Sequence, residues 1–374
     1  MPNNLPRRTA SVAIPKASLQ QVFDNLRAAG FSLIGPTVRD GAIVLEEIEG
    51  LDDLPQGWVD EQQPGQYRLK KSRDNQYFGF GVGPHSWKQF LHPPRLRLFS
   101  AAQENGQWAF RPPTEPPPRY AFIGVHACDL AAIGVQDRVL IGGEFRDPHY
   151  AARREQAFLL AANCGVANSS CFCTSMKTGP KVTSGFDLAL TELPDIFLVE
   201  VGSEAGSEML RGVAWEAATA FDLSRASRVT QHAEKQITRQ MRTGDLPDVL
   251  YENLEDAHWD EVATRCLSCA NCTLVCPTCF CTTVEDASNL RGTAAERTRL
   301  ADSCFNRDFS HVHGGNIRPT TKSRYRQWLT HKLASWIDQF GTSGCVGCGR
   351  CITWCPVGIE ITEEVNSICA KAAR

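Results

Sequence analysis

The feature that most constrains this chain is a run of closely spaced cysteines near the C-terminal end of the sequence. Three cysteines recur at every third position, a fourth follows after three further residues, and a proline closes the run: Cys345, Cys348, Cys351, Cys355 and Pro356. This is the C-x2-C-x2-C-x3-C-P spacing of bacterial-type [4Fe–4S] sites. Gly347 and Gly349 suit that chemistry, because a residue without a Cβ lets the backbone fold tightly around an inorganic cube. The run therefore predicts a site for a cubane cluster.

A second run repeats this spacing without a gap, and its members are Cys266, Cys269, Cys272, Cys276 and Pro277. In proteins with two such runs, the fourth cysteine of one run serves the other cluster. We therefore predict two clusters with exchanged ligands. The first would be held by Cys266, Cys269, Cys272 and Cys355. The second would be held by Cys345, Cys348, Cys351 and Cys276.

Zinc sites and disulfides are the alternative uses of these cysteines. Zinc sites usually place two cysteines close together and two far away in the sequence, whereas four arrive in one run here, twice. Disulfides suit small secreted domains. This chain has 374 residues, 16 cysteines and no recognisable secretory leader. Both alternatives therefore explain the pattern less well than two clusters do.

Composition and charge exclude several other classes of protein. The formal net charge is −3, and no basic patch with interleaved aromatic residues indicates a nucleic-acid-binding surface. No apolar run reaches the length of about eighteen residues that a membrane-spanning helix needs. Arg7 and Arg8 lack the apolar segment that would follow them in a twin-arginine export signal. We therefore expect a cytoplasmic protein without a membrane span.

The expected fold is a multidomain α+β protein, in which an N-terminal α/β region precedes an all-α domain with two [4Fe–4S] clusters. Residues 1–118 would form an α/β subdomain that ends in a stiff, Pro/Gly-rich connection, and residues 119–250 a second α/β domain. Short apolar runs at 120–125, 157–162, 186–190 and 196–200 predict its buried sheet. Polar residues and cysteines follow the first two runs, where ligands sit in open α/β sheets.

Residues 251–374 would form the helical dicluster domain. The two cysteine runs are separated by the 67 residues from 278 to 344, far more than a compact bacterial ferredoxin places there. Apolar residues within this spacer, among them Tyr325, Leu329 and Trp336, follow helical spacing. Thr362 is a candidate N-cap for a final helix. The long spacer and these helices favour an all-α domain over a small β-rich one.

Eight cysteines lie outside the two runs, and four of these fall in the second α/β region: Cys128, Cys164, Cys171 and Cys173. A cubane needs four ligands, so we hypothesise a third [4Fe–4S] cluster here, in which Asp129 or His126 could replace one thiolate. The alternative is that Cys128 and Cys164 are ordinary core residues. Cys279, Cys281 and Cys304 are expected to line a cluster as weak S–H donors, and the alternative is that they supply ligands to a further site.

Beyond these runs, the sequence resembles the β, dicluster-ferredoxin subunit of cytoplasmic [NiFe]-hydrogenases of the sulfhydrogenase type, a family that includes the A subunit of anaerobic sulfite reductase. The resemblance covers nearly the whole chain. It is carried by Gly124-Val125-His126-Ala127-Cys128-Asp129-Leu130, Cys171-Phe172-Cys173-Thr174-Ser175-Met176, Phe186-Asp187-Leu188-Ala189-Leu190-Thr191-Glu192, Cys276-Pro277-Thr278-Cys279-Phe280-Cys281 and Ser323-Arg324-Tyr325-Arg326-Gln327-Trp328. The resemblance implies electron relay between a flavin subunit that binds NAD(P)H and a catalytic subunit, which holds nickel and iron in the hydrogenases and sirohaem in the sulfite enzyme.

Three functions remain open from the sequence. The first is an electron-transfer subunit without chemistry of its own, in keeping with the lack of a nucleotide fingerprint, paired carboxylates or a nucleophile–base pair. The second is a self-contained iron–sulfur flavin oxidoreductase, and the third is a binding module with purely structural clusters. The resemblance favours the first, with a [NiFe]-hydrogenase as the complex and an anaerobic sulfite reductase as the alternative.

Overall fold

The structure is a computed structural model that describes residues 5–113 and 116–372. Its largest element is an eight-stranded mixed sheet with the order β12-β1-β11-β10-β9-β8-β2-β3. Strands β2, β8, β9 and β10 run parallel to one another, and the remaining neighbours pair antiparallel. The strands are β1 (Ser11–Pro15), β2 (Ser32–Arg39), β3 (Ala42–Glu47), β8 (Tyr120–Val125), β9 (Phe158–Ala162), β10 (Leu188–Glu192), β11 (Ile196–Val201) and β12 (Glu216–Ala217).

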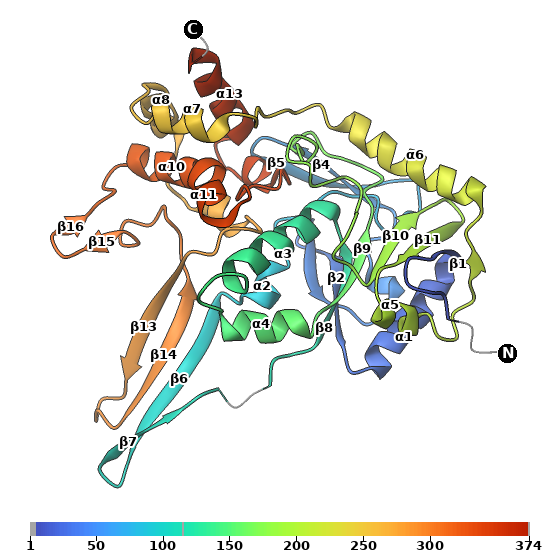
Figure 1. Cartoon of the computed structure of the whole chain (residues 1–374), viewed down its shortest axis with the longest axis horizontal. Helices are drawn as coiled ribbons and strands as arrows, with labels where there is room; N and C mark the ends of the chain where they lie inside the picture. The colour runs from blue at the N-terminus through green and yellow to red at the C-terminus, as the bar shows by residue number, and fades with distance from the viewer. Residues whose placement is uncertain (1–4, 114–115, 373–374) are drawn as a thin grey trace.

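Both faces of this sheet are covered, because alternate residues of its central strands belong to different cores. Leu33 packs into one core with α1, and its neighbour Ile34 packs into another with α3 and α4. Figure 1 shows α3 and α4 in front of the sheet and α6 along one edge of the molecule. The helices of this part are η1 (Lys16–Ser18), α1 (Leu19–Ala28), η2 (Leu51–Asp53), α2 (Lys88–Leu91), α3 (Ala127–Leu140), α4 (Pro148–Glu155), α5 (Glu204–Met209) and α6 (Ala220–Gln236).

The expected N-terminal α/β region and its buried strands are confirmed. Strands β8, β9, β10 and β11 coincide with the four predicted apolar runs to within two residues. The sheet also takes β1, β2 and β3 from the first 47 residues of the chain. One sheet therefore crosses the boundary expected at residue 118.

The segment expected as a stiff connection contains two strand pairs. Strands β4 (Trp58–Gln63) and β5 (Gln66–Lys71) form a hairpin, and β6 (Arg95–Glu104) pairs with β7 (Gln107–Arg111). Asn105 and Gly106 both have positive φ, as a tight hairpin turn requires. The expected stiff connection is therefore folded into two hairpins, and its prolines from Pro112 onward follow the second of them.

Strand β6 joins a hairpin from the dicluster region, so that a four-stranded sheet projects from the body (Figure 1). Its order is β13-β14-β6-β7, with β13 (Thr282–Ser288) and β14 (Ala294–Ala301). A second, very short hairpin follows at β15 (His311–Val312) and β16 (Gly315–Asn316). The dicluster region is therefore mainly helical but contains β-structure, which the sequence did not predict.

Helices from both sides of the spacer build the core of the dicluster region. They are α7 (Leu246–Glu252), α8 (His258–Arg265), α9 (Asn271–Leu274), α10 (Thr321–Thr330), the π-helical turn η3 (His331–Ser335), α11 (Trp336–Phe340), α12 (Arg350–Thr353) and α13 (Ile361–Ala372). Trp259, Tyr325, Trp328 and Leu329 are buried together in this core with Ile352 of the second run. The helices predicted around Tyr325 and near Thr362 are present as α10 and α13. The predicted N-cap is wrong, because α13 begins at Ile361 and Thr362 lies inside its first turn.

Buried polar contacts join this region to helix α3 and to the β4–β5 hairpin. Arg350, in the second cysteine run, forms a two-pronged ion pair with Asp129 of α3, at 2.8 and 3.1 Å. Thr353 donates a hydrogen bond to Gln62 of β4. Within the residues described, no helix combines the length and apolar character required to cross a bilayer.

Candidate metal centres

The two cysteine runs adopt the same local backbone. Ser268 and Ala270 in the first run have positive φ, and so do Gly347 and Gly349 at the equivalent positions of the second. Each run then enters a short helix, α9 or α12, and these two helices contact each other. The left-handed residues turn the chain so that the cysteines before and after them face one space.

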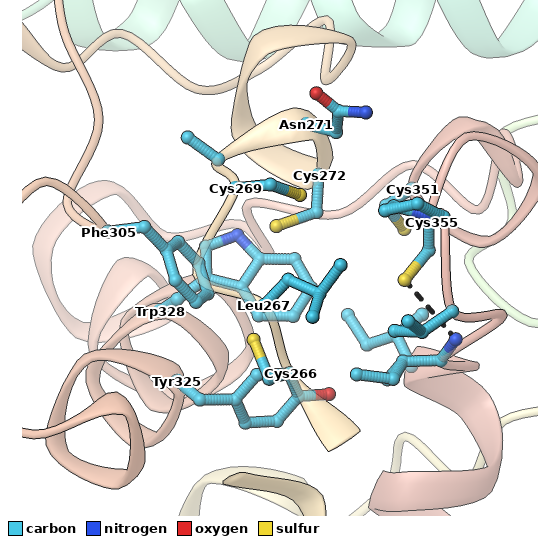
Figure 2. A pocket seen from close by; sticks show the side chains of 15 residues that line it. Cys266, Leu267, Cys269, Asn271, Cys272, Phe305, Tyr325, Trp328, Cys351 and Cys355 are labelled. Carbon is cyan, nitrogen blue, oxygen red and sulfur yellow. Dashed lines mark hydrogen bonds between the residues drawn. The ribbon is translucent and has the colours of Figure 1, made fainter. Parts of the chain in front are cut away.

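The first candidate centre is a cavity between the two runs. Figure 2 shows the sulfur atoms of Cys266, Cys269, Cys272 and Cys355 facing this common space. Three of these cysteines come from the first run, and Cys355 is the last cysteine of the second. Apolar and aromatic side chains complete the wall, including those of Phe305, Tyr325, Trp328, Ile359 and Ile361. The structure therefore brings together the four residues predicted for the first cluster.

Backbone amides point at two of these sulfur atoms. The N–H of Ser268 donates to Cys266 Sγ at 3.4 Å, and that of Ile359 donates to Cys355 Sγ at 3.3 Å. Burial and the neighbouring thiols of Cys266, Cys355 and Cys269 raise the pKa of Cys272. Four thiolates cannot share this space without cations, which the irons of a cluster supply.

The second candidate centre lies beside the first. Burial, followed by the thiols of Cys345, Cys348 and Cys276, raises the pKa of Cys351. Cys276 therefore lies among the three cysteines of the other run, as predicted for the second cluster. The neighbours of Cys351 also include Cys272 of the first centre. The N–H of Gly347 donates to Cys345 Sγ at 3.5 Å, which matches the Ser268 bond in the first run.

A buried lysine contacts the second centre directly. Lys332 Nζ donates hydrogen bonds to Cys276 Sγ at 3.3 Å, to Thr278 Oγ1 at 3.1 Å and to the carbonyl oxygen of Gly344 at 2.9 Å. Its side chain is almost completely buried, and it belongs to the π-helical turn η3. Burial opposes its charge, but the thiols of Cys276 and its neighbours raise the pKa of Lys332 well above its ordinary value. A permanent positive charge therefore lies at this centre.

Lys88 is a second lysine nearby, and burial lowers its pKa from the ordinary value. Its Nζ donates to the carbonyl oxygens of Cys276 and Cys279, at 2.8 and 2.9 Å. Neither lysine was singled out from the sequence, because each lies far along the chain from the cysteines that it contacts. The sequence offered one signal for Lys332, since it stands beside Leu333 in an otherwise apolar helical pattern.

These residues fit [4Fe–4S] clusters. Each centre has four thiols and at least one N–H donor directed at sulfur, and the first also has largely apolar walls; such features hold and tune these clusters. In the described part of the chain, no three His, Cys, Asp or Glu side chains converge as closely as a single metal ion requires. A cubane carries its four ligands on four separate irons, so its thiolates stand further apart than those around one ion.

The four cysteines of the α/β region also lie together. Cys128, Cys171 and Cys173 belong to one buried cluster with Cys348 of the second centre. Burial, then the thiols of Cys173 and Cys171, raises the pKa of Cys164. The two alternative ligands differ: the Asp129 carboxylate is bound by Arg350, whereas buried His126 Nε2 has no hydrogen-bond partner among the described residues.

The remaining cysteines surround the second centre or lie in the core. The thiol of Cys279 is hydrogen-bonded to that of Cys276, and the thiol of Cys281 to that of Cys304. Cys279 thus occupies the place of an S–H donor to a cluster ligand, as expected. Cys369 is buried in α13.

Comparisons with known proteins agree with this geometry. A family described as "4Fe-4S dicluster domain" matches residues 265–359, the part that contains both runs. Sulfhydrogenase 2 subunit beta from Pyrococcus furiosus is 35% identical over 257 residues, which cover 67% of this chain and 74% of that protein. No solved structure matches the chain. The chain therefore belongs to the sulfhydrogenase beta-subunit family, as an iron–sulfur electron-transfer subunit with two [4Fe–4S] clusters.

Proposed function

We propose that this chain relays single electrons between an NAD(P)H-oxidising flavin subunit and the catalytic subunits of a cytoplasmic [NiFe]-hydrogenase. In this proposal Cys266, Cys269, Cys272 and Cys355 hold one cluster. Cys345, Cys348, Cys351 and Cys276 hold the other. The clusters supply one-electron carriers, and the chain holds them, shields them from water and adjusts their potentials.

The contact between the two centres is the observation that carries this proposal. In the proposed ligand assignment each centre takes its fourth thiol from the other run. Cys351, assigned to the second centre, also lines the cavity of the first. A cluster with a structural role alone needs no second cluster at its side. Two adjoining carriers, in contrast, form a path for electrons.

The first centre also reaches the protein surface. Cys269 is exposed, and Leu267 and Val357, which line the same cavity, are 63% and 41% exposed. Exposed apolar side chains around a redox centre suit contact with another protein. This rim is where we expect a partner subunit to exchange electrons with the first cluster.

Reduction by a physiological donor tests the proposed partners. The chain is purified anaerobically with the proteins that co-purify with it, and the visible absorbance of the clusters is followed under NADPH, H2 or sulfite. The proposal predicts bleaching by NADPH and by H2 when all subunits are present, and by neither with the isolated chain. Oxidation of reduced clusters by sulfite would assign the complex to the sulfite reductases. A flavin bound to the isolated chain would contradict the relay and favour a self-contained oxidoreductase.

The ligand exchange has its own test. Cys355→Ala should disturb the signal of the cluster held mainly by the first run, although Cys355 belongs to the second. Cys276→Ala should disturb the other signal. If each substitution altered the cluster of its own run instead, the ligand assignment would be wrong.

A further inference from the structure

The four cysteines of the α/β region follow the carboxyl ends of two parallel strands, where ligands bind in open α/β sheets. Cys128 lies in the first turn of α3, directly after β8, and Cys164 follows the end of β9. Cys171 and Cys173 belong to the loop that continues from Cys164. Since β8 and β9 are neighbouring parallel strands, their carboxyl ends open at the same edge of the sheet. The topology thus gathers cysteines from separate segments at one place.

We infer that Cys128, Cys164, Cys171 and Cys173 hold a third [4Fe–4S] cluster, next to the second. This inference extends the electron relay proposed above. The dicluster match covers residues 265–359 and includes none of these cysteines. The evidence is their mutual contact, their environment and their position relative to the second centre.

Their contacts converge on one space. Cys128, Cys171 and Cys173 pack in one buried cluster. The N–H of Cys164 donates to the carbonyl oxygen of Pro180 at 3.3 Å, which brings Cys164 next to Gly179. A Cβ placed on Gly179 would lie 3.3 Å from Cys173 Sγ and 3.2 Å from the Cβ of Ala127. The loop is therefore closed tightly over these cysteines.

The surroundings favour a negatively charged group. Helix α3, with fourteen residues, begins at Ala127, so its positive end faces this space. Asp129 would repel an anionic cluster, but the buried guanidinium of Arg350 neutralises its carboxylate through two hydrogen bonds. Ordinary core cysteines need neither the positive helix end nor this pairing. The arrangement is the one expected if the thiols are thiolates bound to iron.

The loop with Cys171 and Cys173 is attached to the loop of the second centre. Phe172 N–H donates to the Gly347 carbonyl oxygen at 2.9 Å, and Thr178 Oγ1 donates to the Val346 carbonyl oxygen at 2.6 Å. Gly347 has no room for a Cβ, which would lie 2.6 Å from the oxygen of Phe172. Cys348 belongs to the same buried cluster as Cys128 and Cys173. A cluster here would therefore adjoin the second one and lengthen the path to three carriers.

The iron content of the purified chain tests directly for a third cluster. Iron, sulfide and zinc are quantified on the full chain, purified anaerobically, and Mössbauer spectroscopy gives the fraction of iron in cubanes. Three clusters predict about twelve irons per chain, at four per cubane, and two predict about eight. Cys171→Ala and Cys164→Ala should each lower the count to about eight and leave the other two clusters intact. Cys369→Ala, which removes a buried thiol from α13, is the matched control and should keep about twelve.

Several outcomes would overturn the inference. A wild-type count of about eight irons would do so without any variant, and so would twelve irons in Cys171→Ala. One zinc per chain that disappears in Cys171→Ala would show a single-ion site instead. None of these outcomes affects the two-cluster relay, whose test depends on reduction by partner proteins.

Discussion

Lys332 Nζ lies 3.3 Å from Cys276 Sγ, although 56 residues separate the two in the sequence. The π-helical turn that contains Lys332 directs its side chain into the dicluster core, and such turns often occur at functional sites. The ammonium group offsets part of the negative charge of a cluster bound by Cys276. A positive charge beside a cluster stabilises the reduced form, which carries one more electron.

Replacement of Lys332 by methionine should therefore lower the reduction potential of the second cluster. A unit charge about 5 Å from the cluster contributes about 3 kcal/mol at an effective dielectric constant of about 20. That energy corresponds to a shift on the order of 100 mV for one electron. An EPR-monitored redox titration measures it. The control is Lys322→Met, which removes from α10 a lysine that is paired with Asp260 of α8. Equal potentials in Lys332→Met and wild type would refute the role assigned to Lys332.

The ion pair between Arg350 and Asp129 should stabilise the contact between the cluster region and the large sheet. Both side chains are buried, at 2% and 3% exposure. Asp129→Asn leaves the guanidinium without its counter-charge, which costs about 3–5 kcal/mol for buried pairs. Chemical denaturation under anaerobic conditions should show that loss, and the double variant Asp129→Leu/Arg350→Met should recover part of it. Strictly additive effects would contradict direct coupling between the two side chains.

Two left-handed residues, one in each run, should respond oppositely to substitution. Ala270→Gly removes the strain of a positive φ, roughly 1–2 kcal/mol, and should leave the clusters intact. Gly347→Ala should disrupt the second centre, because its Cβ would lie 2.7 Å from the backbone of Cys173. Iron content and thermal unfolding of both variants measure this difference. A Gly347→Ala protein with wild-type iron content and stability would contradict the described packing.

His92 should make the fold sensitive to acid. Burial, and then the charge of Arg299, lowers the pKa of His92 from 6.5 to about 4. Between these two pH values the unfolded chain binds the proton and the folded chain does not, so the free energy of unfolding falls as the pH falls. The full effect approaches about 3 kcal/mol. His92→Gln should flatten the pH dependence of the melting temperature between pH 6.5 and 4, and an unchanged slope would show that other groups cause it.

The sequence was most informative where the relevant spacing is local. Both runs place three cysteines within seven residues, so their shared geometry follows from the spacing alone. The exchange of Cys276 and Cys355 was predicted from the same pattern. The four buried strands were also predictable, because continuous apolar runs reflect burial on both faces of a sheet.

Contacts between distant segments could not be predicted in the same way. Gly347 was expected to make room for a cluster, whereas the structure places the loop of Phe172 and Cys173 against it. Strand β6 finds its partner β14 across almost 200 residues. Arg350 reads as an ordinary basic residue until Asp129 is seen beside it. In each case the deciding neighbour comes from another part of the chain, and no local pattern identifies it.

The central claim is that the two centres carry electrons, and EPR spectroscopy during reduction tests it most directly. The anaerobically purified chain is titrated with dithionite, and signals are recorded at cryogenic temperature. The relay predicts reversible one-electron reduction of both clusters, with about one unpaired spin per cluster and spectral broadening from their proximity. Clusters that stay oxidised at every accessible potential would contradict the relay and leave them with a structural role only.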